Sequence, residues 1–359
     1  MKKNGRTLAA FIAAATLTGM LTGCGLKSPT STAADSSGTS TAASNTETVT
    51  PAEDAVTLVF AEVNSLDSLD GKIATFFKEK VEEKTNGSVI IDIQASGVLG
   101  AEADVLDGMT NNNGTVDLCR ISCFALNSYG GKLSSLLSVP YTFESREHFW
   151  KFTETELAQR ILDEPQELGL GIHGLYYQEE GFRDFFMVEP VNGIEDLAGK
   201  KIRVSSDPIL TGVVESLGAS PTVISFTELY TSLQSGVVDG GDQPVTLYES
   251  NAFNEVAPNF LMDHHTLSAS EVVVSDESWN ALTTEQQDAI MEAGQETSEY
   301  AKSLSAQKEE ESIARLKEKG VVFTEVTDYA PWKEACADVI AQFTAGMEEE
   351  YAQLTALAN

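Results

Sequence analysis

Residues 199–240 read GKKIRVSSDPILTGVVESLGASPTVISFTELYTSLQSGVVDG and contain two strand signals, each followed by a helix signal. Lys201–Val204 is a short strand-like run. Asp207 then precedes Pro208, which suits a first helical position because its φ is fixed and it has no amide hydrogen to leave unpaired. Thr222–Ile224 is the second strand, and Ser225 with Glu228 predicts a capping box for a helix to Gln234. This order predicts parallel strands in an α/β sheet.

A similar unit lies nearer the N-terminus. Its three expected strands and two expected helices alternate along the chain, and Asn86-Gly87 ends the first helix. In order they are Val56–Phe60, Leu69–Thr85, Ser88–Ile93, Glu102–Asn112 and Val116–Ser122. Two such units predict an α/β protein with two lobes.

The third feature is a long helical run from Thr283 to Lys319. Thr283 and Thr284 with Gln286 and Gln287 offer a capping box, and Gly320 suits the C-terminal end. Gly294 is the weak point inside the run. About 35 residues would extend about 50 Å, which exceeds one lobe, so we expect this helix to brace both.

The N-terminal segment has the features of a lipoprotein signal. Lys2, Lys3 and Arg6 precede an apolar stretch, Leu8–Leu21, which is short for a membrane span. Leu21-Thr22-Gly23-Cys24 resembles the bacterial lipobox, in which the Cys is lipidated and becomes the new N-terminus. We therefore expect residues 1–23 to be a signal peptide. Residues 24–54 are expected to be the lipidated Cys24 and a disordered tether rich in Ser and Thr.

The composition excludes several classes of function. With 23 Lys+Arg against 55 Asp+Glu, the formal charge of the 359-residue chain is −32, which opposes binding to nucleic acid or to anionic lipid. Hydrophobic residues make up 42% and allow a sizeable core. Four Cys and four scattered His predict neither a disulfide framework nor a zinc site, and no cofactor is expected.

Catalytic motifs are absent from the sequence, which has no G-x-S-x-G, H-E-x-x-H or P-loop pattern. The features that remain are those of a binding protein. Arg183 and Arg203 both stand in apolar, strand-like surroundings, and a guanidinium matches a carboxylate bidentately. Each arginine taken alone is explained more simply by a structural salt bridge, because acidic residues are abundant. His264-His265 is expected in a loop or in the core.

Segments from about residue 56 to the C-terminal region resemble the solute-binding proteins of TRAP transporters, the dicarboxylate-binding (DctP-type) family. Each matching word is short, but their order and spacing together are specific. The longest words are Ile194–Val204, Leu217–Thr222, Ser225–Tyr230 and Leu233–Gly240, and the shorter ones are Lys84–Gly87, Leu99–Glu102, Val139–Tyr141, Gly181–Arg183 and Phe253–Val256.

The resemblance implies a two-lobed, periplasmic-binding-protein-like fold with a ligand cleft between lobes that close by hinge bending. It implies a protein that is not an enzyme and that delivers its solute to an ion-gradient-driven membrane permease. Arg203 matches the family's Lys-Ile-Arg-Val arginine, which clamps the solute carboxylate. Arg183 matches the Gly-x-Arg arginine, a second polar contact. Phe226 matches an aromatic residue that packs on the solute, although core packing would also explain it.

The sequence departs from the family pattern at Gln243. The family commonly reads Asp-Gly-Gln-Glu-Asn-Pro where this chain has Asp239–Pro244, so Gln243 replaces a ligand-binding Asn with a longer amide. Glu102 and Ser122 stand where some members contact sugar-acid hydroxyls, although Glu102 also suits a helix start.

Arg120 should share the strand face of Ser122, because the two residues are two positions apart. It is then either a third arginine of the cleft or the partner of an acid such as Glu62. The sequence leaves these two interpretations open.

The expected lobes are residues 55–179 plus 267–308 and residues 180–266 plus 309–359. The expected function is capture of a small carboxylate, a sugar acid or a dicarboxylate, by a monomeric receptor that is lipid-anchored to the outer face of the bacterial cell membrane. A solute sensor on the same fold, or an extracytoplasmic enzyme acting on a sugar acid, are the alternatives.

Overall fold

The computed structural model describes residues 50–358. Cys24 and the expected signal peptide lie outside the described residues, as does most of the expected tether. The strands are β1 Val56–Ala61, β2 Val89–Gln94, β3 Leu118–Ser122, β4 Ile172–Met187, β5 Lys201–Val204, β6 Ser220–Val223, β7 Gly240–Gln243, β8 Asn259–Ser275 and β9 Val322–Glu325.

The helices vary from five to 35 residues. They are α1 Leu69–Lys84, α2 Glu102–Thr110, α3 Arg146–Thr153, α4 Glu156–Glu167, α5 Pro208–Ser216, α6 Leu229–Gln234, α7 Val245–Ser250, α8 Asp276–Asn280, α9 Thr284–Glu318, α10 Ala330–Ala335, α11 Ala337–Thr344 and α12 Glu348–Ala356. No helix among these described residues is long and apolar enough to cross a bilayer.

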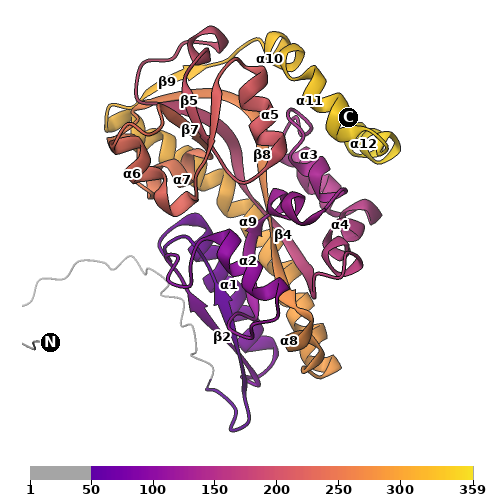
Figure 1. Ribbon diagram of the computed structural model, residues 1–359. Coiled ribbons are helices and arrows are strands. Elements are labelled where there is room, and N and C mark those ends of the chain that lie inside the picture. Colours follow the sequence, from indigo (N-terminus) through magenta and orange to yellow (C-terminus); the bar gives the residue numbers. More distant parts are fainter. Residues whose placement is uncertain (1–49, 359) are drawn as a thin grey trace, which may run out of the picture. The chain divides into compact units, whose positions relative to one another are not determined.

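The strands form one mixed sheet in the order β2-β1-β3-β8-β4-β7-β5-β6, with β9 paired to β8. β1 pairs in parallel with β2 and β3, and β5 pairs in parallel with β6 and β7. These parallel pairings confirm the two α/β units predicted from the sequence. The long strands β4 and β8 run antiparallel between the two units and join them (Figure 1).

The β4–β8 pair is irregular near its middle. Its register shifts between Glu179 and Phe182 and again between Arg183 and Phe185. Gly181 has a φ of +106°, and a Cβ there would lie 2.8 Å from Oε2 of Glu309 in α9. The positive φ therefore favours glycine at the point where β4 passes from one unit to the other, and a larger residue there would be strained and would displace Glu309.

The helix α1 follows the predicted pattern. Ser68 Oγ accepts a hydrogen bond from the Gly71 amide at 3.0 Å and so caps its N-terminus. Ile73, Phe77 and Val81, at helical spacing, are fully buried under the sheet.

The segment after β6 differs from the prediction. Ser225 does not cap a helix: its hydroxyl donates to the Glu228 carboxylate at 2.6 Å. Residues Phe226–Glu228 form a 3-10 turn, and α6 begins only at Leu229. The side-chain bond replaces the reciprocal backbone bonds that a capping box requires.

The helix α9 packs along both units, as predicted (Figure 1). Ile290 and Ala293 lie in a core cluster with α1 and β1, whereas Leu316 lies in one with α7 and β8. The predicted capping box forms between Thr283 and Gln286. The arrangement agrees with a helix that braces the two lobes.

The C-terminal segment packs first against α5 and then against α3 and α4. Trp332 and Val339 pack with α5, but Leu354 in α12 packs with residues of α3 and α4. His148 Nε2 lies 2.8 Å from the Leu354 carbonyl oxygen. The segment that follows α9 thus covers more than one apolar surface. The expected lobe boundaries stay predictions.

Gly294 supplies a close contact rather than a weak point. A Cβ at this position would lie 2.8 Å from Cδ1 of Tyr176, a buried residue of β4. We expect Gly294→Ala to lower the melting temperature, because overpacking at about 1–3 kcal/mol outweighs the gain of about 1 kcal/mol in helix propensity. Thermal unfolding followed by circular dichroism measures the effect.

The matched control is Gly108→Ala in α2. A Cβ there meets only the side chain of Asn113, which is exposed and can move. This variant should be as stable as the wild type or slightly more stable. Equal or higher stability of Gly294→Ala would contradict the close-packing interpretation.

Candidate binding site

A cavity of about 270 Å³ lies where the carboxyl ends of parallel strands from both units meet. Ligands of open α/β sheets bind at this edge, because the strand ends leave a crevice there. One group of lining residues follows β1, α2 and β3: Val63, Asn64, Ala101, Glu102, Ala103, Arg120 and Ser122. The other comes from β4 onward: Glu180, Arg183, Arg203, Ser205, Ser206, Val223, Ile224, Ser225, Phe226, Thr227, Gln243 and Leu247.

Arg203 is buried and lacks a carboxylate partner among residues 50–358. Its Nε donates to the Ile224 carbonyl oxygen at 2.8 Å, and its Nη1 has no hydrogen-bond partner in the described chain. Burial lowers the pKa of Arg203 to about 10; Asp242 opposes this shift and Arg183 adds to it. The side chain is still a cation at neutral pH, and a buried donor without a partner is costly.

Arg183 is compensated by the protein itself. Its Nε donates to Oδ2 of Asp242 at 2.5 Å, and its Nη2 donates to the Asp242 carbonyl oxygen at 2.8 Å. The guanidinium lies over the Phe124 ring, 5.3 Å from its centroid. Burial alone would raise the pKa of Asp242, but Arg183 and His265 together outweigh it and hold that pKa below its usual range.

His265 extends this charge network behind the cavity. It is buried, with Nδ1 2.8 Å from Asp263 Oδ2 and Nε2 3.4 Å from Asp242 Oδ2. Burial alone would lower the pKa of His265, but Asp263 and Asp242 outweigh it and raise it to about 10. His265 is therefore a charged core residue, one of the two placements expected for it.

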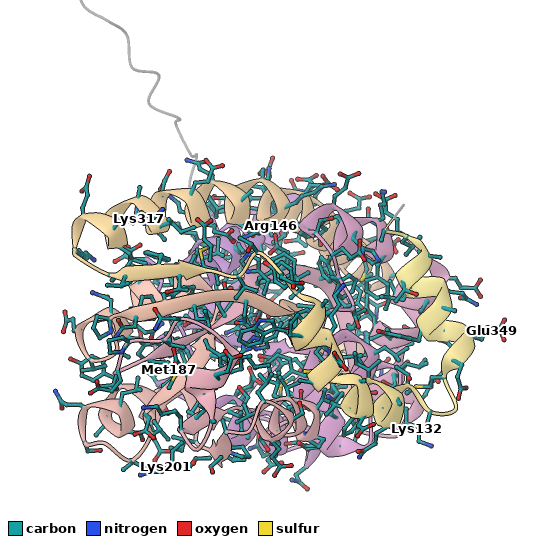
Figure 2. All side chains as sticks on the ribbon, turned by 90° about the horizontal axis from the view of Figure 1, so that it is seen from above. Lys132, Arg146, Met187, Lys201, Lys317 and Glu349 are labelled. Atoms are coloured by element: carbon teal, nitrogen blue, oxygen red, sulfur yellow. The ribbon has the colours of Figure 1, made fainter. Side chains whose placement is uncertain are left out.

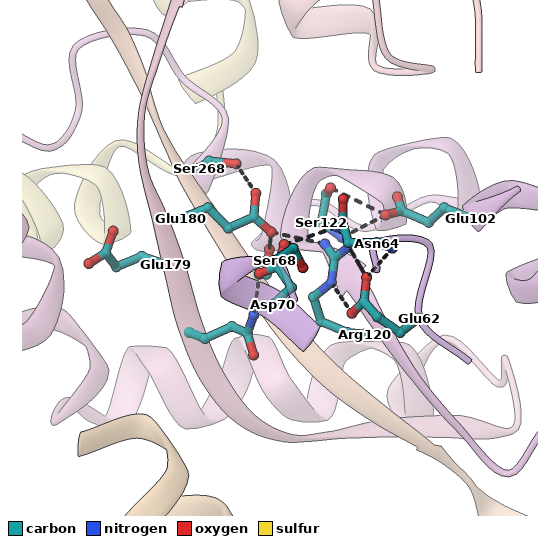
Figure 3. A network of polar contacts seen from close by, with 12 residues as sticks. Glu62, Asn64, Ser68, Asp70, Glu102, Arg120, Ser122, Glu179, Glu180 and Ser268 are labelled. Carbon is teal, nitrogen blue, oxygen red and sulfur yellow. Dashed lines mark hydrogen bonds and ion pairs between the residues drawn. The ribbon is translucent and has the colours of Figure 1, made fainter. Parts of the chain in front are cut away.

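Arg120 lines the cavity and is also paired with Glu62 (Figure 3). Its Nε and Nη2 donate to the two Glu62 carboxylate oxygens at 2.9 and 3.0 Å, and its Nη1 donates to Glu180 at 2.9 Å. Ser268 and Ser270 of β8 donate to the same Glu180 carboxylate. The structure thus gives the acid partner for Arg120, and two carboxylates outnumber its single charge.

Asn64 and Asp70 continue this network (Figure 3). The Asn64 amide donates to Glu62 at 3.1 Å and to Asp70 at 2.9 Å, and Gln178 donates to Asp70 at 2.9 Å. Burial, followed by the nearby Glu180 charge, raises the pKa of Asp70 well above its usual range. Asn64 is buried, and its Oδ1 has no partner within residues 50–358. The cavity therefore has an excess of acceptors at this end.

Glu102 begins α2 and faces Ser122 at the end of β3. Its Oε2 accepts from the Ser122 amide at 3.2 Å and from the Ser122 hydroxyl at 3.3 Å. Burial raises the pKa of Glu102, which Arg120 opposes. The carboxyl group is thus fixed at the cavity wall and is not only a helix-start acid.

Phe226 and Gln243 lie on the side of the cavity formed by β6 and β7. Phe226 is half-buried and packs edge-on against Phe253, with ring centroids 5.8 Å apart. It therefore contacts the core and the cavity together. Gln243 is buried at the end of β7 and lines the cavity.

Seven of the eight predicted binding residues line this cavity, and Glu62 lies behind it as the partner of Arg120. Sequence reasoning missed Asn64 and Glu180. Asn64 lies two residues after Glu62 in the segment that follows the predicted strand Val56–Phe60, and Glu180 directly precedes the Gly181–Arg183 segment of the family resemblance. Both signals were in the sequence, but neither indicates a side-chain contact by itself.

The fold and the cavity define a two-lobed protein of the periplasmic solute-binding class. A family model described as bacterial extracellular solute-binding protein, family 7 (DctP), matches residues 60–346. The chain belongs to this family, that of the TRAP transporter solute-binding proteins.

Several relatives support the assignment. A solute-binding protein of Roseobacter denitrificans is 32% identical over 267 residues, which cover 74% of this chain and 80% of the relative. The C4-dicarboxylate-binding periplasmic protein DctP of Rhodobacter capsulatus is 27% identical over 287 residues, 79% of this chain and 85% of the relative.

A crystal structure supports the fold. It is that of a TRAP periplasmic solute-binding protein from Roseobacter denitrificans with bound L-galactonate. It matches with a TM-score of 0.78 and 29% identity, covering 86% of this chain and 100% of that chain.

The charge of His265 should make folding stability depend on pH. Its pKa of about 10 in the folded protein exceeds the ordinary value of about 6.5. Its contribution is therefore fully present below about pH 6.5 and is lost as the pH rises toward 10, at most about 1.4 kcal/mol per pH unit. Urea unfolding at several pH values measures the slope.

A nuclear magnetic resonance titration tests the same point without a variant. The His265 ring nitrogens should keep the doubly protonated signature at pH 8 in the folded protein and lose it in urea. A neutral ring at pH 8 in the folded protein would refute the charged-core assignment.

Proposed function

We propose that this protein captures a small hydroxylated carboxylate, a sugar acid, in the cavity and delivers it to a TRAP-type membrane permease. The observation that carries the proposal is Nη1 of Arg203, a buried donor that has no hydrogen-bond partner in the part of the chain that the structure describes. Arg183 and Arg120 are already paired with carboxylates of the chain, so Arg203 is the guanidinium that an incoming carboxylate would complete.

The opposite end of the cavity favours hydroxyl groups over a second carboxylate. Asn64 Oδ1 is an acceptor that no donor within residues 50–358 reaches, and Glu102 and Glu180 are carboxyl groups at the wall. A second solute carboxylate would face these acids, and Arg120 beside them is already paired with Glu62 and Glu180, so the repulsion would cost several kcal/mol. Solute hydroxyls would instead supply the missing donors.

The relatives include examples of both solute classes, dicarboxylates and sugar acids. The Rhodobacter capsulatus relative is named for C4-dicarboxylates, and the Roseobacter denitrificans structure contains L-galactonate, a polyhydroxy acid. The charges of the cavity support the second class for this chain.

Delivery follows from the two-lobed arrangement. Arg203 and Phe226 come from one unit, and Asn64 and Glu102 come from the other. A solute that contacts both groups binds the closed form preferentially and shifts the population toward it. The permease would then recognise the closed lobes, while lipidated Cys24 would hold the receptor at the outer face of the cell membrane.

Arg203→Ala should weaken sugar-acid binding at least about 30-fold, the lower end for loss of a buried charge pair. Isothermal titration calorimetry with a panel of sugar acids measures it, after a thermal-shift screen has identified a ligand. Arg160→Ala is the matched control, because Arg160 is exposed and pairs only with Glu350 among the described residues. Unchanged affinity of Arg203→Ala would refute Arg203 as the carboxylate clamp.

Glu102→Gln should narrow the preference between solute classes. We expect the wild type to bind a sugar acid at least about tenfold more tightly than succinate, and Glu102→Gln to gain affinity for succinate because it removes a facing negative charge. Asp104→Asn, an exposed neighbour in α2, should change neither affinity. Tighter binding of succinate than of any sugar acid by the wild type would contradict this assignment.

A further inference from the structure

A second cavity, of about 290 Å³, adjoins the first between α2, the 3-10 helix Cys123–Tyr129 and the loop that follows β5. The residues that line only this cavity are Leu106, Asp107, Phe124, Ala125, Ser128 and Tyr129. None of the predicted site residues lies in this set, and the carboxylate clamp does not require the second cavity.

The two cavities share a wall made of four residues: Glu102, Ala103, Ser205 and Ser206. Three of these side chains are short, and Ala103 and Ser206 are exposed. The one long side chain, Glu102, is held against Ser122 by two hydrogen bonds. Apart from Glu102, only short side chains therefore stand between the two cavities, and a solute in the first cavity could extend past them into the second.

The lining of the second cavity indicates what would occupy it. Leu106 and Phe124 are buried and give it an apolar surface. At its rim the Tyr129 hydroxyl donates to Asp107 at 2.5 Å, and the Ser128 hydroxyl donates to the Ser206 carbonyl oxygen at 2.9 Å. An apolar wall with a few polar groups suits a sugar ring, which has a C–H face and a hydroxyl edge.

The charges of the lining residues further restrict the chemical class of molecule that could occupy the second cavity. No Lys or Arg is among the residues that line the second cavity, whereas Asp107 and the shared Glu102 are acidic. A second carboxylate would meet only like charge there. A neutral sugar ring avoids this repulsion and can donate hydroxyl hydrogens to the carboxylates.

We propose that the second cavity is a subsite for a neutral sugar unit, so that the protein takes a disaccharide acid whose carboxylate lies at Arg203. This inference rests on the proposed sugar-acid function and names the solute more closely. The acidic unit fills the first cavity, and the glycosidic link passes over Ala103, Ser205 and Ser206.

The experiment compares three probes by isothermal titration calorimetry on the wild-type protein. The first probe is glucuronate. The second is a pair of disaccharides that join glucuronate to one neutral sugar, placed at the reducing end in one and at the non-reducing end in the other. The third is digalacturonate. We expect at least one glucuronosyl disaccharide with a neutral sugar unit to bind as tightly as glucuronate or more tightly. Digalacturonate, which carries two carboxylates, should bind at least about tenfold more weakly than that disaccharide.

Ala125→Trp tests the second cavity without altering the first, because Ala125 lines only the second. It should weaken disaccharide binding by at least about tenfold and leave glucuronate binding within about twofold. Ala281→Trp is the matched control: Ala281 lines a third cavity of about 290 Å³ that shares no lining residue with the solute cavity. Tyr129→Ala repeats the test at the rim should Ala125→Trp fail to fold.

Each outcome decides the inference. Selective loss of the disaccharide in Ala125→Trp or Tyr129→Ala supports it. Rejection of every disaccharide acid by a wild type that binds glucuronate overturns the subsite alone, as does equal loss of both ligands in a folded variant. Tighter binding of digalacturonate, with its two carboxylates, than of the disaccharides that carry one carboxylate and one neutral sugar also overturns it. Failure of the wild type to bind any sugar acid would instead refute the proposed function.

Discussion

The structure depends on the antiparallel pairing of β4 with β8. These two strands run through both parallel units, so one sheet carries both lobes. Their central residues also build the cavity, because Glu180 and Arg183 come from β4, and Ser268 and Ser270 of β8 bind Glu180. The register shifts lie at the same place, so the join between the lobes and the ligand site occupy one stretch of chain. Arg146 of α3 links that stretch to α9, because it forms ion pairs with Glu179 of β4 and with Glu309 of α9. Figure 2 labels Arg146 beside α9.

Compensation of buried charge then decides what the cavity can accept. Three buried guanidinium groups face it, and the described residues supply carboxylates to Arg120 and Arg183 but not to Arg203. Burying a charge without a partner is unfavourable, and an anionic ligand removes this cost. A strongly acidic chain can therefore still offer an anion site of the kind we propose, because among residues 50–358 its carboxylates pair with Arg120 and Arg183 and none forms an ion pair with Arg203. The same acids make the other end of the cavity, and the second cavity beside it, unsuitable for further negative charge.

Much of this arrangement could be predicted from the sequence because it rests on local signals. Strand–helix alternation gave the parallel units, and the Thr283–Gln286 capping box and Gly320 gave the limits of α9. The failures were also local in origin: Ser225 bonds to the side chain of Glu228, which a four-residue pattern does not distinguish from a capping box. Gly294 was predicted to weaken the helix, because helix propensity carries no information on Tyr176, which packs against Gly294 from β4.

The sequence by itself determined the fold class, which follows from periodicity, and the family, which follows from ordered segments along the chain. The family resemblance also singled out Arg183 and Arg203, whereas Arg120 stayed open between the cleft and a pairing with Glu62. Only the tertiary structure decided which arginine is uncompensated. The partners of Arg120 and Arg183 lie 58 and 59 residues away, and no spacing rule connects them. The shared wall between the two cavities is likewise tertiary, since Ala103 and Ser206 come from different units of the fold. Charge pairing and enclosure depend on distances in space, and those distances arise only when β4 and β8 bring the two units together.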